Sequence, residues 1–152
     1  MAQQRNITTT ATPSRAYGAI YWATPAATAN ETNTPIKCAG TTAAQSTANK
    51  ITQATTNRLT FTGSDTRAFG VVFTGIMTAS AATNATVYIY ANGAVVTGVG
   101  NTRAMPITDK GNAVLNCFVD LAPGGYIELW CETDDGDNIT IESGVLAIRS
   151  ID

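Results

Sequence analysis

Apolar and polar residues alternate along several short stretches of this chain. The clearest case is residues 126–132, where Ile127, Leu129 and Cys131 form one alternate set and Tyr126, Glu128, Trp130 and Glu132 form the other. Successive side chains of a β-strand point to opposite faces of a sheet, so this pattern predicts strands with one inward and one outward face. No stretch repeats its apolar residues at the helical period of about 3.6. The pattern therefore predicts an all-β chain.

Turn-forming residues divide the chain into short strands at fairly even spacing. The predicted strands cover residues 16–23, 36–39, 57–62, 68–78, 86–91, 94–97, 114–121, 126–132, 139–142 and 144–148. We expect residues 41–56 to form a loop and 105–107 to be a candidate edge segment. Gly70 and Gly75 predict that the strand around them is buried on both faces or bulged. This many short strands are typical of a β-sandwich.

Three sets of turn residues fix the expected connections. Asn92-Gly93 lies between two apolar runs and is the strongest hairpin signal, because both residue types tolerate a positive φ. Pro123-Gly124 and the acidic run 134–138 predict two further turns. A two-residue hairpin joins antiparallel strands, so we expect antiparallel pairing.

The chain divides into an arm and one domain. Residues 1–15 are polar, rich in threonine and interrupted by Pro13, so we expect an extended N-terminal arm. Residues 16–152 are predicted to form a single jelly-roll domain, since a chain of 152 residues suits one core. The first residues lack the apolar stretch of a secretory signal peptide, and we therefore expect folding in a cytosol.

The charge pattern argues against two classes of partner. Only 13% of the residues are charged and the formal net charge is -2. The basic residues are scattered, whereas a phosphate-binding groove needs grouped lysines and arginines, so we expect no nucleic-acid partner. The apolar runs are far shorter than the roughly 20 residues that cross a bilayer, so we expect no membrane partner.

The reactive side chains favour a protein that is not an enzyme. The chain contains no histidine, which excludes Ser-His-Asp and Cys-His hydrolases. Cys38, Cys117 and Cys131 lack the spacing of a metal site, and we interpret them as small buried hydrophobic residues. For Cys117, a thiol in the core is favoured over a nucleophile.

Two acidic sets leave alternatives open. A glycosidase would need a pair of carboxylates about 5 to 10 Å apart. The candidates for such a pair are Glu128, Glu132 and Glu142. Solvated strand carboxylates are the favoured interpretation of these three residues. Asp134, Asp135 and Asp137 could hold calcium, but their spacing does not match a twelve-residue calcium loop, and an acidic turn is favoured. We expect no catalytic residue, cofactor or metal.

The final third of the chain resembles a known fold family. Residues 114–121 end in a leucine, 123–129 place a glycine-containing turn before an isoleucine-containing strand, and 143–148 place Ser-Gly before a short apolar strand. This order is similar to the closing strands of the tumour necrosis factor and complement globular-head jelly rolls. The resemblance implies an all-β antiparallel jelly-roll β-sandwich of the tumour necrosis factor-like type.

A second resemblance covers about two thirds of the chain. Its ordered motifs are residues 57–63, 66–69, 87–93 and 126–130. They are similar to small structural proteins of tailed bacteriophages, which are head-decoration (cement), head-fibre or tail-associated proteins. The resemblance implies a homotrimer that binds the major capsid protein on the outer surface of a phage head and is assembled in the host cytoplasm.

Candidate interface residues follow from the outward aromatic side chains. Tyr126 and Trp130 share a face with Glu128, away from the apolar set of the same strand, so we expect Tyr126, Glu128 and Trp130 at the trimer interface. The alternative is that these aromatics fill the core. Tyr17, Tyr21 and Trp22 are further candidates with the same alternative.

The arm supplies the expected contact with the capsid. We expect the anchoring residues to be Gln3, Gln4, Arg5, Asn6 and Ile7. Such an arm would order on binding and donate main-chain hydrogen bonds along a sheet edge. The alternative function is a fibre or tail-tip module that recognises a host receptor or glycan, because the same fold serves both roles. A tip module is expected to follow a fibrous stalk, which this sequence lacks, and decoration is therefore favoured.

Overall fold

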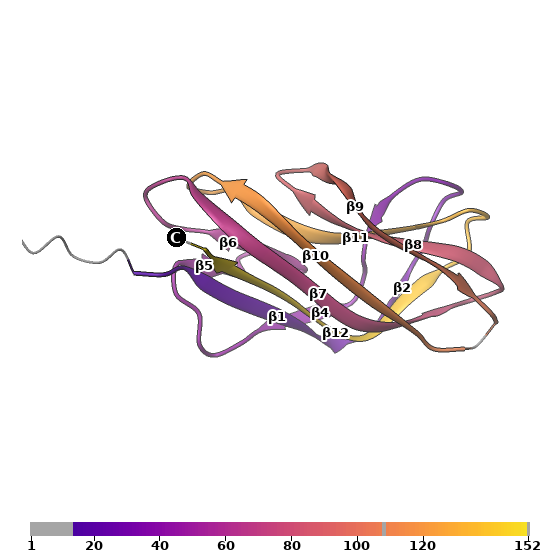
Figure 1. The fold of residues 1–152 in the computed structure, drawn as a ribbon. Coiled ribbons are helices and arrows are strands. Elements are labelled where there is room, and N and C mark those ends of the chain that lie inside the picture. The colour runs from indigo at the N-terminus through magenta and orange to yellow at the C-terminus, as the bar shows by residue number, and fades with distance from the viewer. Residues whose placement is uncertain (1–13, 108, 152) are drawn as a thin grey trace, which may run out of the picture.

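The computed structural model describes residues 14–107 and 109–151. These residues contain twelve β-strands in two layers, with the long strands of each layer side by side (Figure 1). No helix in this part of the chain is long and apolar enough to span a membrane. The strands are β1 (Tyr17–Thr24), β2 (Ala27–Thr28), β3 (Ile36–Lys37), β4 (Thr41–Ala44), β5 (Ile51–Thr52), β6 (Arg58–Phe61), β7 (Arg67–Ala79), β8 (Thr83–Ala91), β9 (Ala94–Met105), β10 (Gly111–Leu121), β11 (Tyr126–Thr133) and β12 (Ile139–Ser150).

Each layer is a six-stranded sheet. The first sheet has the order β10-β7-β12-β1-β4, with β2 paired to β12, and the second has the order β5-β6-β11-β8-β9, with β3 paired to β11. All pairs of named strands are antiparallel. This arrangement confirms the predicted antiparallel jelly-roll sandwich.

The core lies between the sheets and is built from their alternate inward residues. Phe61, Phe69 and Phe73 are completely buried. The rings of Phe61 and Phe69 meet edge to face at 5.0 Å, and Trp22 meets Phe73 at 5.8 Å in the same geometry. Burying a phenylalanine side chain stabilises a fold by about 1.5–3 kcal/mol. These rings therefore hold the layers together, and Trp22 is a core residue.

The two strongest turn predictions are confirmed. Asn92 and Gly93 have φ values of 52° and 82°, so the β8–β9 hairpin closes through two left-handed residues. Gly124 has a φ of 81°, and Gly125 N–H donates to Ala122 O at 2.8 Å, which closes the turn before β11. Both turns use residue types that adopt a positive φ at low cost.

The loop predicted for residues 41–56 is wrong, because this stretch contains β4 and β5. β4 pairs with β1, and β5 pairs with β6. The hydroxyl of Thr42 accepts hydrogen bonds from Gln53 Nε2 at 2.6 Å and from the Asn57 N–H at 3.0 Å. Hydrogen bonds, more than buried apolar side chains, hold this segment in place. Its residues are small and polar, so the alternation that predicts a strand is nearly absent.

Among the strands that were predicted, the two at the end of the β8–β9 hairpin and at the end of the chain differ most from the prediction. The second strand of the β8–β9 hairpin continues to Met105, whereas the sequence placed its end at residue 97. The last segment is a single strand, β12, and not the predicted pair of strands. Its pairing with β7 shifts register between Ile141 and Ser143, so a bulge at this point interrupts the alternation and imitates a turn.

The prediction that β7 is buried on both faces or bulged at its glycines is wrong. Val71 and Phe73 are completely buried, whereas Val72 between them is exposed. Gly75 pairs with Gly144 on β12, and the bulge next to this pair places its extra residue in β12 and not in β7. The ring of Phe73 lies against both glycines from the core side, where any Cβ would collide with it. The glycines therefore make room for a ring beneath the sheet.

Candidate functional site

The outer faces of the two sheets carry different side chains. The outer face of the second sheet, here called the aromatic face, includes Arg58, Tyr88, Tyr90, Tyr126, Glu128, Trp130 and Glu132. The outer face of the first sheet, here called the apolar face, includes Tyr17, Tyr21, Val72, Val114 and Phe118. Strand alternation produces both faces, because the intervening residues of each strand point into the core.

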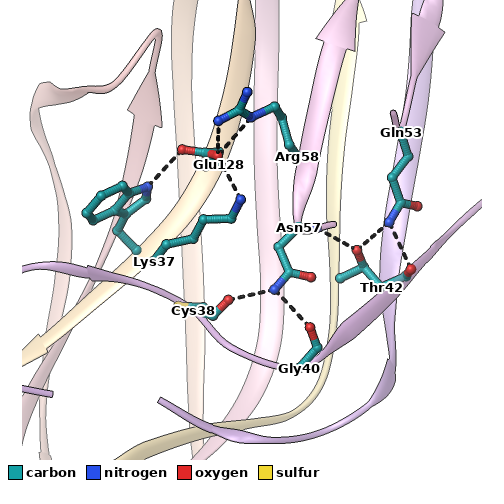
Figure 2. Close-up of polar contacts among 9 residues, drawn as sticks. Lys37, Cys38, Gly40, Thr42, Gln53, Asn57, Arg58 and Glu128 are labelled. Atoms are coloured by element: carbon teal, nitrogen blue, oxygen red, sulfur yellow. Dashed lines mark hydrogen bonds and ion pairs between the residues drawn. The ribbon is translucent and has the colours of Figure 1, made fainter. Parts of the chain in front are cut away.

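Glu128 is the centre of the aromatic face. Its carboxylate accepts hydrogen bonds from Lys37 Nζ and Arg58 Nε, both at 2.9 Å, and Figure 2 shows the two cations converging on one oxygen. The indole N–H of Trp130 donates to the other oxygen at 3.1 Å. Glu128 is only 1% exposed, so its interpretation as a solvated strand carboxylate is wrong. Its partners lie 70 and 91 residues away in the sequence, beyond the reach of a local pattern.

The ionisation of Glu128 reflects two opposed effects. Burial raises the pKa of its carboxyl group, but hydrogen bonds from Lys37, Arg58 and Trp130 lower it, and the pKa ends below its ordinary value. The carboxylate is therefore charged at neutral pH, and cations of the same chain compensate its charge. Two partly exposed cations against one anion leave this cluster with a local positive charge.

The aromatic rings beside Glu128 are arranged as stacks. The rings of Tyr90 and Trp130 lie parallel, 4.3 Å apart and inclined by 13°. The Arg58 guanidinium lies 3.7 Å above the centre of the Tyr126 ring. Tyr126 and Trp130 share the outer face of β11 with Glu128, as the alternation predicts, and both are half-buried. Their assignment to a trimer interface stays a prediction.

A clamp built around Asn57 positions Arg58. Asn57 has a φ of 59°, and its side-chain amide donates to Cys38 O at 2.6 Å and to Gly40 O at 3.0 Å (Figure 2). Asparagine tolerates this left-handed backbone better than most residues. The clamp ties the start of β6 to the chain after β3, so it brings Arg58 and Lys37 to the same carboxylate.

Farther along the aromatic face, Tyr88 donates a hydrogen bond to Glu132. Burial and the neighbouring carboxylate raise the pKa of Tyr88 to about 12. The phenol is therefore neutral at physiological pH and serves as a donor. The carboxylates of Glu128 and Glu132 on the aromatic face therefore both accept hydrogen bonds from side chains of the same chain.

The apolar face is the feature that sequence reasoning missed in part. Phe118 is 70% exposed and Val114 is 58% exposed on β10. Val72, Tyr17 and Tyr21 are each 42% exposed on neighbouring strands. Tyr17 and Tyr21 were candidates from the sequence. The sequence did contain an indication of the exposed residues on β10, because apolar residues occupy both alternate sets of residues 114–121.

The remaining sequence candidates lie elsewhere. Cys38, Cys117 and Cys131 are buried free thiols, which confirms their interpretation as small core residues. Burial raises the pKa of Cys117, and a neutral thiol of this kind is a poor nucleophile. The anchoring residues Gln3 to Ile7 lie outside the described residues, and the described end of the predicted arm is Ser14 and Arg15.

The acidic run after β11 forms a hydrogen-bonded turn. Asp134 accepts from the backbone N–H and the side-chain amide of Asn84, and these bonds lower its pKa. Thr83 Oγ1 lies 3.0 Å from a carboxylate oxygen of Asp134 and 2.6 Å from one of Asp135. Asp137 N–H donates to Asp135 at 3.3 Å. Within residues 14–107 and 109–151, no group of three or more metal-ligating side chains is present.

No protein-family model and no curated protein matches the sequence. Solved structures do match over nearly the whole chain. Murine APRIL at pH 5.0 aligns with a TM-score of 0.62 and 8% identity, covering 91% of this chain and 100% of that one. The Eiger TNF of S. frugiperda aligns with a TM-score of 0.58 and 12% identity, covering 90% and 94%.

A third match comes from the complement system. The globular domain of zebrafish complement 1qA aligns with a TM-score of 0.51 and 11% identity, covering 91% of this chain and 98% of that one. This chain has the tumour necrosis factor and complement-head jelly-roll fold. Identities this low establish the fold alone, so the function must be argued from the two sheet faces.

Proposed function

We propose that this protein is a homotrimeric decoration, or cement, protein on the outer surface of a bacteriophage head. Two further copies of the chain and the major capsid protein are its partners, and assembly takes place in the host cytoplasm. The apolar face carries the proposal, because a lone subunit leaves Phe118 and Val114 largely in water. Contiguous apolar patches on a soluble domain typically mark contacts with other proteins.

Two other observations support a structural role. The likeness of residues 57–148 to small structural proteins of tailed phages favours a place in the virion. The polar groups of the aromatic face are joined in ion pairs and stacks within one subunit, which suits a rigid building block. In this proposal the arm of residues 1–15 contacts neighbouring capsid subunits through Gln3, Gln4, Arg5, Asn6 and Ile7.

The trimer is tested first in solution. Sedimentation velocity over a series of concentrations measures the mass of the assembled species. A trimer that persists at low micromolar concentration is the expected result. A monomer at every concentration would contradict the proposal, because the apolar face would then have no partner of its own kind.

The capsid contact needs a separate experiment. Purified protein is mixed with phage heads that lack their decoration protein, and the bound fraction is recovered by density-gradient sedimentation. The full chain is expected to bind, whereas a variant without residues 2–13 is expected to remain a trimer and lose binding. This deletion keeps Ser14 and Arg15, whose backbone carbonyls accept from Arg67 and Asn49. Equal binding by the truncated protein would exclude the arm as the anchor.

A second candidate function is recognition of a host receptor or glycan by the aromatic face. The Tyr90–Trp130 stack beside the partly exposed cations Lys37 and Arg58 favours an acidic sugar as ligand. Binding of the purified protein to an array of acidic and neutral glycans tests this function. Retention of an acidic glycan by the parent and its loss in Trp130→Ala would favour recognition over decoration.

A further inference from the structure

A shallow groove of about 340 Å³ lies next to Phe118 on the apolar face. Its lining residues are Arg15, Gly70, Val72, Arg149, Ser150 and Ile151. Gly70 pairs with Phe118 on one side and with Arg149 on the other, so the groove crosses β7 near its start. The floor is apolar and its rim carries two arginines.

The groove exists because Gly70 has no side chain and because the two ends of the described chain are fixed beside it. A Cβ built on Gly70 would lie 3.7 Å from both the Phe118 ring and the Ile151 side chain, so the missing side chain leaves the space between them unfilled. Ile151 N–H donates to Ala68 O at 3.1 Å, which holds the C-terminal segment along β7. Ala16 and Ser150 are joined by two hydrogen bonds, which fix the neighbouring residues Arg15 and Arg149.

Phe118 and Asp120 form a ridge beside this groove. They lie two residues apart on β10, so both point outward, and both are exposed. Among the described residues, no ion pair involves Asp120, Arg15 or Arg149. The ridge therefore combines an apolar ring with an unpaired anion, and the groove combines an apolar floor with unpaired cations. The two surfaces are complementary in both respects.

We propose that the ridge of one copy docks into the groove of the next copy, with Phe118 over Gly70 and Val72 and with Asp120 against Arg149. This inference rests on the proposed homotrimer and names its contact surfaces. A contact between different patches of identical chains repeats around a ring and closes if the rotation matches the number of copies. The occupant is a second copy because the chain itself carries the matching ring and carboxylate.

A charge-swap series tests the contact between Asp120 and Arg149. The variants are Asp120→Arg, Arg149→Asp and the double variant that carries both changes. Each single variant places like charges together and is expected to weaken assembly by roughly tenfold or more, whereas the double variant restores opposite charges and recovers most of the loss. Sedimentation equilibrium at low and high salt measures the association constants. The difference between parent and single variants is expected to shrink as salt screens the charges.

Matched controls separate charge from folding. Asp65→Arg changes the net charge by the same amount as Asp120→Arg, but at an exposed turn residue outside the ridge and the groove. This control is expected to leave assembly unchanged. Phe118→Ala removes the apolar part of the ridge, and because this side chain is 70% exposed, its loss is expected to leave the fold of the subunit intact. The circular dichroism spectrum is therefore expected to match that of the parent while the association constant falls, and the melting temperature is expected to fall only as far as the lost assembly lowers it.

The outcomes distinguish this inference from the proposed function. A trimeric parent whose charge variants all assemble like the parent would overturn the ridge-and-groove contact and leave the homotrimer intact. A monomeric parent would overturn both. A dimeric parent with rescue by the double variant would support the contact and exclude the trimer. Loss of head binding without loss of assembly in Arg149→Asp would assign the groove to the capsid protein and overturn the inference.

Discussion

The Glu128 carboxylate and the Arg58 guanidinium lie 2.8 Å apart on neighbouring strands of the second sheet, and their backbones are paired in register. The carboxylate is almost completely buried, whereas the Arg58 side chain is 29% exposed. Water can solvate the Arg58 cation in part, whereas the buried Glu128 carboxylate relies on its partners in the protein. A buried charge that loses its compensation destabilises a fold strongly.

Glu128→Gln is expected to destabilise the protein by about 1–3 kcal/mol. The amide keeps the shape of the side chain but leaves Lys37 and Arg58 without their anion, and their partial exposure to solvent limits the loss. Urea denaturation followed by circular dichroism measures the change. Glu31→Gln removes an exposed carboxylate and is expected to stay within about 0.5 kcal/mol of the parent. Equal effects of the two substitutions would contradict the role assigned to Glu128.

Glu128 is also expected to make stability fall in acid. Its pKa in the folded protein lies below the ordinary value of 4.5, so its contribution is fully present above that value and is lost as the pH falls through the folded pKa. The difference in unfolding free energy between the parent and Glu128→Gln is therefore expected to be constant from pH 7 to about 5 and to shrink below that. A difference that grows in acid would reverse the sign of the assigned shift.

Gly75→Ala is expected to destabilise the fold by about 1–3 kcal/mol, because its Cβ would lie 2.6 Å from the Phe73 ring and 2.8 Å from Ser143 O. Gly70→Ala on the same strand meets only ordinary contacts at 3.7 Å and is expected to be neutral or slightly stabilising in the subunit. Thermal unfolding of the two variants side by side measures the difference. Equal melting temperatures would show that the Phe73 ring moves aside.

Phe118→Ala and Trp130→Ala distinguish the two candidate interfaces. If copies meet through the apolar face, Phe118→Ala weakens assembly and Trp130→Ala keeps it. Trp130→Ala is then expected to lose about 1–3 kcal/mol of subunit stability, because the Tyr90 stack and the hydrogen bond to Glu128 disappear. The reverse pattern in sedimentation would place the interface at Tyr126, Glu128 and Trp130, as the sequence predicts.

The sequence predicted the sandwich because most of its strands follow simple alternation. Residues 126–132 and the Asn92-Gly93 turn behave as local pattern requires. The sequence did not reveal β4 and β5, because side-chain hydrogen bonds between small polar residues replace hydrophobic periodicity there. The bulge in β12 was invisible for a related reason, since one extra residue shifts the alternation.

The sequence predicted which residues of the candidate site share a face only where those residues belong to one strand. Alternation alone places Tyr126, Glu128 and Trp130 on one face. The burial of Glu128 depends on Lys37 and Arg58, which reach it from other strands after long separations in sequence. The groove depends on three strands and both chain ends, so its residues become neighbours only in the folded sheet.

The two hydrogen bonds between Ala16 and Ser150 have a practical consequence for any use of this protein as a display scaffold. They bring the two ends of the described chain together, and Figure 1 shows the end of β12 beside the start of β1. A protein fused after β12 would therefore lie close to the end of the N-terminal arm, which is proposed to contact the capsid.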